Sequence, residues 1–117
     1  MFQANPAKEG WSEDEVALME EHLGGNVLPF FEADFYGNWT YDEDYDELFI
    51  YIVSAESVAN AAAALEAAGY AVSYDADDAY LEAYLEVEGG TISVYGIYFA
   101  QSEYGYFSAS FAAAEVE

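Results

Sequence analysis

Hydrophobic and polar residues alternate most regularly in the second half of the chain. From Tyr80 to Glu88, leucine, alanine and valine at odd positions alternate with tyrosine and glutamate at even positions. A period of two predicts a strand that is buried on one side and carries carboxylates and phenols on the other. Gly89-Gly90 then provides a turn signal, and a second alternating run from Thr91 to Phe99 completes a predicted hairpin.

A helix over residues 77–88 is the competing interpretation of the first of these runs. Tyr80 and Tyr84 stand four residues apart, as do Leu81 and Leu85, and this spacing also suits one face of a helix. The unbroken alternation and the glycine pair that follows favour the strand.

Residues 12–25 carry the sequence features of a helix. Ser12 followed by Glu15 forms a capping box, in which each side chain accepts a hydrogen bond from the backbone of the other residue. Val16, Met19 and Leu23 supply a narrow apolar stripe. Gly24-Gly25 is expected to end this helix.

A second helix is predicted over Val58 to Ala68, which is rich in alanine, the best helix former. Ser54, or alternatively Ser57, is expected to cap this helix, and Gly69 to end it. Tyr70 to Tyr74 is the predicted strand that follows. The short links suggest a parallel βαβ unit with a right-handed crossover, and an antiparallel return of this strand is the alternative.

Three other segments complete the predicted order of elements. The continuous apolar run Leu48 to Val53 predicts a strand buried on both faces. The preceding acidic segment, residues 39–47, is interpreted as a polar connection. Residues 26–37 are ambiguous, with a short helix after Pro29 as one interpretation. Tyr104 to Ala112 is the predicted last strand, since phenylalanine and alanine at positions 107, 109 and 111 alternate there with tyrosine and serine at positions 106, 108 and 110.

These elements predict an α+β fold, a mostly antiparallel sheet of about five strands with two or three helices on one face. The length of 117 residues suits a single domain spanning residues 1–117, with residues 1–10 as a leader arm.

The net charge of the chain is unusual for a globular domain of this size. The chain has 24 aspartates and glutamates against a single basic residue, Lys8, and its formal net charge is -23. Aromatic residues make up 19% of the chain, which distinguishes it from a disordered acidic tail. A molecule of this charge repels nucleic acid and anionic lipid, so we expect a basic protein as its partner. The absence of cysteine, a signal peptide and a long apolar span predicts a cytoplasmic protein, as a monomer or a homodimer.

The sequence offers little for catalysis or metal binding. Carboxylate pairs are too abundant to single one out as an acid–base pair. The spacing from Asp75 to Glu86 approaches a calcium-binding loop, but Ala79 and Tyr80 occupy a ligand position and the glycine position. His22, the single histidine, lies where a helix end favours a cation. We therefore predict no enzymatic activity, no cofactor and no metal site.

The acidic residues gather in three clusters, and tyrosines accompany them. An array of carboxylates on strands and turns approximates the spacing of phosphates, and tyrosines favour protein interfaces. The predicted partner-binding residues are Asp42, Glu43, Asp44, Asp46 and Glu47; Asp75, Asp77 and Asp78; Glu82, Glu86 and Glu88; and the tyrosines Tyr41, Tyr45, Tyr80 and Tyr84.

In size, in its acidic runs 42–47 and 75–88, and in its near absence of lysine and arginine, the chain resembles small acidic DNA-mimic proteins of phages and mobile elements. That resemblance implies a non-enzymatic inhibitor, acting in the host cytoplasm, that occupies the basic groove of a CRISPR effector or a restriction enzyme. Two alternatives remain. One is a salt-adapted (halophilic) domain of unrelated function, and the other is an immunity- or chaperone-type binder of a basic protein.

Overall fold

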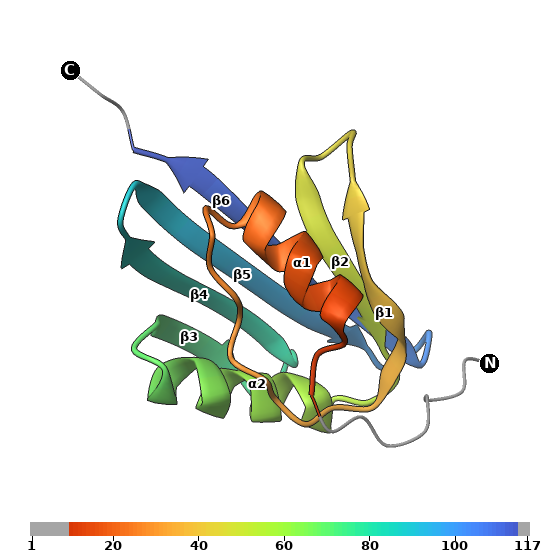
Figure 1. Ribbon diagram of the computed structural model, residues 1–117. Helices are drawn as coiled ribbons and strands as arrows, with labels where there is room; N and C mark the ends of the chain where they lie inside the picture. Colours follow the sequence, from red (N-terminus) through yellow and green to blue (C-terminus); the bar gives the residue numbers. More distant parts are fainter. Residues whose placement is uncertain (1–9, 115–117) are drawn as a thin grey trace.

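Two helices lie on one face of a six-stranded sheet in the computed structural model, which describes residues 10–114 (Figure 1). The predicted leader arm lies almost entirely outside the described residues. In chain order the elements are α1 (Glu13–His22), β1 (Phe35–Asp42), β2 (Glu47–Ile52), α2 (Glu56–Ala67), β3 (Ala71–Asp75), β4 (Tyr80–Val87), β5 (Gly90–Phe99) and β6 (Tyr104–Ala113).

The strands are arranged in the order β1-β2-β6-β5-β4-β3, and every neighbouring pair is antiparallel. Strands β3 to β6 form a meander, and the β1–β2 hairpin joins it through pairing of β2 with β6. The predicted α+β class is confirmed. The sheet has one strand more than the five or so expected, because the sequence pattern did not predict β1.

The capping box of α1 forms as predicted. The Ser12 hydroxyl accepts from the Glu15 backbone N–H at 3.2 Å, and the Glu15 carboxylate accepts from the Ser12 N–H at 3.0 Å. The second Glu15 oxygen accepts from the backbone N–H of Trp39 at 3.0 Å. Glu15 is only 1% exposed. One buried carboxylate therefore closes the helix end and also ties it to β1.

Strand β1 replaces the predicted polar connection, and no helix forms between residues 26 and 34. Phe35 and Trp39 are buried, which makes this segment part of the core. The register shifts between Tyr36 and Thr40, so that four steps along β1 match two along β2. Gly37 lies inside this bulge with a φ of 83°. The bulge places glycine and asparagine within the strand, and these residues hid it from a pattern-based prediction.

Strand β2 is buried on one face only, so the prediction of burial on both faces was wrong. Leu48, Ile50 and Ile52 are buried, whereas Tyr51 is 47% exposed. The reason is that both helices cover the same side of the sheet and leave the other side uncovered (Figure 1).

The predicted caps of α2 were also wrong. The helix begins at Glu56 after Ala55, and no side chain caps it. The Ser54 and Ser57 hydroxyls bond each other at 2.9 Å, and the Ser57 hydroxyl accepts from the Asp34 N–H at 2.8 Å. These serines therefore fasten the helix to the extended segment before β1. Gly69, at a φ of 97°, follows the helix end as predicted.

Strand β3 lies at the far edge of the sheet and pairs with β4 in antiparallel fashion. It runs in the same direction as β2, as in a βαβ unit, but β6, β5 and β4 lie between the two strands. Helix α2 links the two strands and contacts β3, β4 and β5.

The β4–β5 hairpin confirms the strand interpretation over the helical one. Its turn is Glu88-Gly89, one residue earlier than predicted, because Val87 pairs with Gly90. Gly89 supplies the positive φ of 89° that this tight turn requires.

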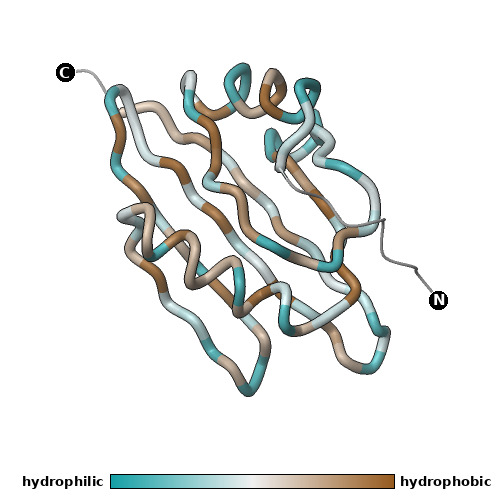
Figure 2. The backbone as a smooth tube through the Cα atoms, turned by 60° about the horizontal axis from the view of Figure 1, so that its bottom comes forward, coloured by the Kyte–Doolittle hydropathy of each residue, from teal (hydrophilic) through white to brown (hydrophobic). Residues whose placement is uncertain are grey.

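The core lies between the helices and the covered face of the sheet. Figure 2 shows hydrophobic and hydrophilic residues alternating along the strands. Gly96 is essential to the packing, since a Cβ there would lie 2.4 Å from the Phe107 ring. Among the described residues, no helix is both long and apolar enough to cross a membrane. The buried residues nearest the sheet centre are Leu81, Ala83, Ile92, Val94, Phe107 and Ala109, packed with Val58, Ala61 and Leu65 of α2 and Met19 and Leu23 of α1.

Candidate protein-binding surface

The side of the sheet opposite the helices is covered by no element of the described chain. Six strands about 4.8 Å apart, with five to ten residues each, give this side an area of roughly 700 Å². A standard protein–protein interface covers roughly 600–1,000 Å² on each partner, so the area of this surface lies within the standard range. We call it the open face; its main members are Tyr36, Glu47, Phe49, Tyr51, Tyr80, Glu82, Tyr84, Glu86, Ser93, Tyr95, Ile97, Phe99, Tyr104, Tyr106, Ser108 and Ser110.

Large side chains cross the open face in one row, perpendicular to the strands. The strand register pairs each member with the next: Tyr36, Tyr51, Tyr106, Ile97 and Tyr80. We call this row the aromatic band. Further rings border it at centroid distances of 5.8–6.5 Å, namely Phe49, Phe99 and Tyr104. Such a contiguous exposed band is typical of a binding surface rather than of a solvated face.

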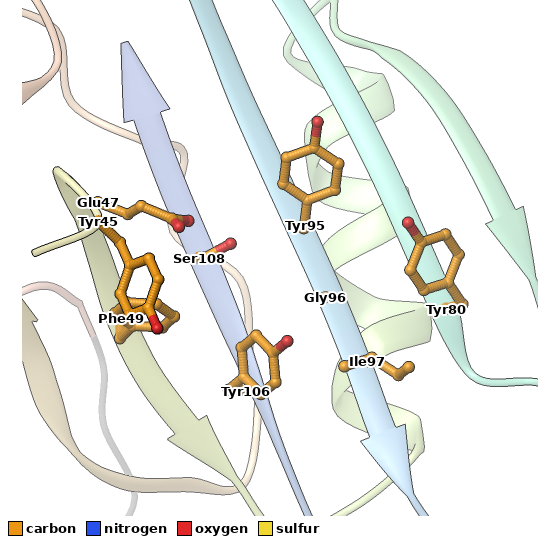
Figure 3. A pocket seen from close by; sticks show the side chains of 9 residues that line it. All are labelled: Tyr45, Glu47, Phe49, Tyr80, Tyr95, Gly96, Ile97, Tyr106 and Ser108. Atoms are coloured by element: carbon orange, nitrogen blue, oxygen red, sulfur yellow. The ribbon is translucent and has the colours of Figure 1, made fainter. Parts of the chain in front are cut away.

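A hollow of about 490 Å³ lies beside the band (Figure 3). The small residues Gly96 and Ser108 lie between the side chains that surround it. Figure 3 shows the Glu47 carboxylate directed over Ser108, with tyrosine and phenylalanine rings around the rest of the hollow. Those rings are Tyr45, Phe49, Tyr80, Tyr95 and Tyr106, and Ile97 completes the lining.

Hydrogen bonds hold several of the phenols in place. Tyr80 donates to the Glu82 carboxylate at 2.6 Å, and this bond raises the pKa of Tyr80 to about 12. The hydroxyls of Tyr84 and Tyr95 lie 3.1 Å apart, and their hydrogen bond raises the pKa of Tyr95 to about 12. At neutral pH Tyr80 and Tyr95 are therefore uncharged, and carboxylates such as Glu47 and Glu82 supply negative charge to the face.

One corner of the sheet concentrates the negative charge. In the β1–β2 turn, Asp42 accepts from the backbone N–H groups of Asp44 and Tyr45 at 2.9 and 3.4 Å. Tyr41 donates to Asp46 at 2.5 Å, and this bond raises the pKa of Tyr41 to about 12. These internal hydrogen bonds fix where the Asp42 and Asp46 carboxylates lie and hold the turn in one conformation.

Helix α1 adds carboxylates to the same corner. The His22 ring stacks on the Tyr41 ring, with centroids 3.6 Å apart and planes within 7°. This stack brings the end of α1 beside the end of β1, and Glu21 lies 3.8 Å from His22 there. We call the resulting group the acidic corner; it consists of Glu21, Asp42, Glu43, Asp44, Asp46 and Glu47.

The second predicted acidic cluster lies elsewhere. The β3–β4 turn is at the opposite edge and the opposite end of the sheet, as the antiparallel order requires. There Asp75 accepts from the N–H groups of Asp77 and Asp78 at 2.9 and 3.2 Å, as Asp42 does in the acidic corner. Ala55, just before α2, lines a pocket together with Asp77 and Asp78, so the positive end of that helix dipole lies near this turn.

The third cluster divides between two places. Glu82 and Glu86 point outward from β4 with Tyr80 and Tyr84, as the alternation predicts, whereas Glu88 lies in the β4–β5 turn. The structure therefore unites the first cluster with the Tyr41 and Tyr45 side chains and places Glu82, Tyr80 and Tyr84 on the open face. It does not bring all three clusters together.

Sequence reasoning missed most of the aromatic band. Tyr51 was assigned to a doubly buried strand, and Tyr36 to an ambiguous segment. Tyr95 and Tyr106 were recognised as alternating residues but not as binding residues. The available signal was the alternation itself, since every second residue of β2, β5 and β6 is expected to face away from a single helical layer.

Among residues 10–114, no group of three or more potential ligands is arranged to hold a metal ion. Comparison with protein-family models, curated proteins and solved structures gave no match, so the function has to be inferred from the chain's own residues.

Proposed function

We propose that this protein is a non-enzymatic inhibitor that occupies the basic nucleic-acid-binding groove of another protein in the manner of a DNA mimic. The observation that carries the proposal is the acidic corner, where the β1–β2 hairpin gathers five carboxylates and the His22–Tyr41 stack brings the end of α1 beside it, on a chain with a net charge of -23. The corner offers a compact group of anions, which a groove lined with lysine and arginine is built to receive.

The geometry of the corner suits this role because its turn is held by hydrogen bonds. Anions in fixed positions need less ordering on binding than anions on mobile loops. Binding would also release the counterions that a chain of this charge attracts, just as DNA does when it meets a basic protein. CRISPR effectors and restriction enzymes, which have such grooves, are the targets that the sequence resemblance implies.

A pull-down from a bacterial lysate, followed by competition with duplex DNA, tests the proposal. We expect the captured protein to bind nucleic acid, to be displaced by DNA, and to bind more weakly as salt rises from roughly 50 to 500 mM. A partner that DNA fails to displace would contradict the proposal.

A charge-matched pair of variants sharpens this test. Neutralising Glu21, Glu43 and Asp44 in the acidic corner removes the same charge as neutralising Glu32, Glu66 and Glu103 elsewhere on the exposed surface. We expect the first triple variant to weaken binding about tenfold more than the second. Equal losses would mean that net charge alone drives association.

The aromatic band favours a second candidate, an immunity- or chaperone-type binder that matches the shape of a basic protein. A DNA backbone contains nothing that exposed aromatic rings could imitate, whereas protein–protein interfaces are enriched in tyrosine. In this case the partner would bind through the open face, and DNA would not displace it. The same competition experiment therefore separates the two candidates.

A further inference from the structure

We propose that the hollow in the open face is a receptor site for an arginine side chain of the partner. The inference deepens the proposed function and rests on it in one respect, namely that the partner is basic. It specifies which cation the surface selects and where that cation lies.

The hollow combines the features that a guanidinium group requires. Aromatic rings from β2, β4, β5 and β6 surround it, and the Glu47 carboxylate is directed over its floor (Figure 3). A guanidinium is flat, so it can stack on a ring while its N–H groups reach a carboxylate. The short side chain of Ser108 and the backbone of Gly96 form the floor, so the group can descend between the rings there.

The same features favour arginine over lysine. An ammonium group is compact and strongly hydrated, and it has no flat face with which to stack. The hollow is open to solvent on one side, so a lysine would gain little by exchanging water for phenol rings. An arginine keeps its planar contact there, because its guanidinium is more weakly hydrated.

Two of the rings are held ready before any partner arrives. Tyr80 is bonded to Glu82 and Tyr95 to Tyr84, so these rings lose little freedom when a ligand stacks on them. Both phenols remain neutral at physiological pH, and their ring faces therefore attract cations through the aromatic quadrupole. No lysine or arginine occurs among the described residues to occupy the site from within.

Binding of short peptides to the full-length protein tests the inference by calorimetry at about 50 mM salt. The probes are two peptides of identical length and charge, one with arginine and one with lysine at every cationic position. We expect the arginine peptide to bind about three- to tenfold more tightly. Equal affinities would overturn the inference.

Variants of the hollow then locate the site. Tyr106→Leu removes a ring, and Ser108→Leu fills the floor without changing charge. We expect each to abolish most of the preference for arginine, whereas Tyr106→Phe, which keeps the ring, retains it. Thermal unfolding of each variant shows whether the fold is intact, and unchanged selectivity in both folded leucine variants would overturn the inference.

The carboxylate has its own matched control. Glu47→Gln and Glu66→Gln remove the same charge, but Glu66 is an exposed residue of α2, on the other side of the sheet. We expect Glu47→Gln to weaken the arginine peptide about threefold more than Glu66→Gln does. Equal effects would show that the net negative charge of the protein alone attracts the peptide, and would overturn the proposed arginine site.

The two proposals fail separately. The peptide experiment contains no nucleic-acid-binding protein, so loss of arginine selectivity leaves displacement by DNA as an independent result. Conversely, the protein could bind arginine selectively while DNA fails to displace its natural partner. That result would overturn the DNA-mimic function but support the arginine receptor site.

Discussion

At the scale of single residues, polar groups in this protein are placed by hydrogen bonds to backbone and phenol rather than by ion pairs. A chain with one basic residue has almost no partners for its carboxylates. Asp42 and Asp75 instead accept from backbone N–H groups of their own turns, while Asp46 and Glu82 accept from tyrosines. These bonds set the orientation of the side chains that we assign to binding.

The raised tyrosine pKa values predict a specific loss of stability at high pH. The pKa of Tyr41 is about 12 in the folded protein, whereas a free tyrosine loses its proton near pH 10. The unfolded state therefore binds fewer protons between these values, and stability falls as pH rises from about 10 to 12. We expect Tyr41→Phe to show a shallower fall in thermal midpoint over this range.

Asp46→Asn is the companion variant, because it keeps the Tyr41 phenol but removes the carboxylate whose hydrogen bond raises the pKa of Tyr41. The fall in thermal midpoint of this variant should be shallower as well. An unchanged slope in Tyr41→Phe would show that the phenol–carboxylate bond does not control alkaline unfolding.

Glu15 gives the sharpest single-residue prediction in the core. Its two oxygens accept from two different backbone N–H groups, at Ser12 and Trp39. Glutamine has only one acceptor oxygen, so Glu15→Gln must turn its amide group toward one N–H and leave that donor unsatisfied. We expect a loss of about 1–3 kcal/mol in the free energy of unfolding, measured with urea.

Glu13→Gln is the matched control, since Glu13 is an exposed carboxylate in the first turn of the same helix. Its loss should stay below about 1 kcal/mol, the usual size of an exposed charge–dipole interaction. Similar losses in the two variants would contradict the role assigned to Glu15.

At the scale of elements, the sheet is shaped by glycines that make room for aromatic rings. Gly96 on β5 pairs with Phe107 on β6, and the Phe107 ring lies over the position where a Cβ would stand. On the opposite side of the sheet, the backbone of Gly96 forms part of the floor of the hollow. One glycine therefore contributes both to core packing and to the open face.

Gly96→Ala is expected to destabilise the fold by about 1–3 kcal/mol through overpacking of the core. The added methyl group would lie 2.4 Å from the Phe107 ring, which has little room to move because it is fully buried. Ser93→Ala on the same strand, which faces outward, should change the unfolding free energy by less than about 0.5 kcal/mol. A stable Gly96→Ala protein would show that Phe107 can repack.

At the scale of the whole molecule, both helices cover one side of the sheet, while the other side presents the aromatic band with acidic groups around it. Self-repulsion among the carboxylates opposes this compact state. The acidic corner and the β3–β4 turn lie at opposite corners, an arrangement that keeps the densest groups apart.

Salt should therefore stabilise the protein, but only over a limited range. Screening of exposed charges is largely complete by a few hundred millimolar, where the Debye length falls well below about 10 Å. We expect the thermal midpoint in sodium chloride to rise steeply from roughly 10 to 300 mM and then to level off. A protein that is unfolded at low salt and continues to gain stability into the molar range would favour the salt-adapted alternative over both binding functions.

Local patterns in the sequence determined a large part of this fold. Alternation predicted β4 with the correct faces and located β5 and β6, and the Ser12–Glu15 spacing predicted the start of α1. These features depend on residues a few positions apart, whose geometry is set by the backbone period and by adjacent hydrogen bonds. The preponderance of acidic residues is likewise a property of composition alone.

Only the tertiary structure decided which surface those residues form. The bulge prevented the prediction of β1. Without β1, the sequence pattern cannot show that the aromatic band extends from Tyr80 to Tyr36. The acidic corner depends on the stacking of His22 on Tyr41, two residues from different elements. Contacts of this kind arise because packing brings distant segments together, and periodicity within one segment carries no information about its neighbours.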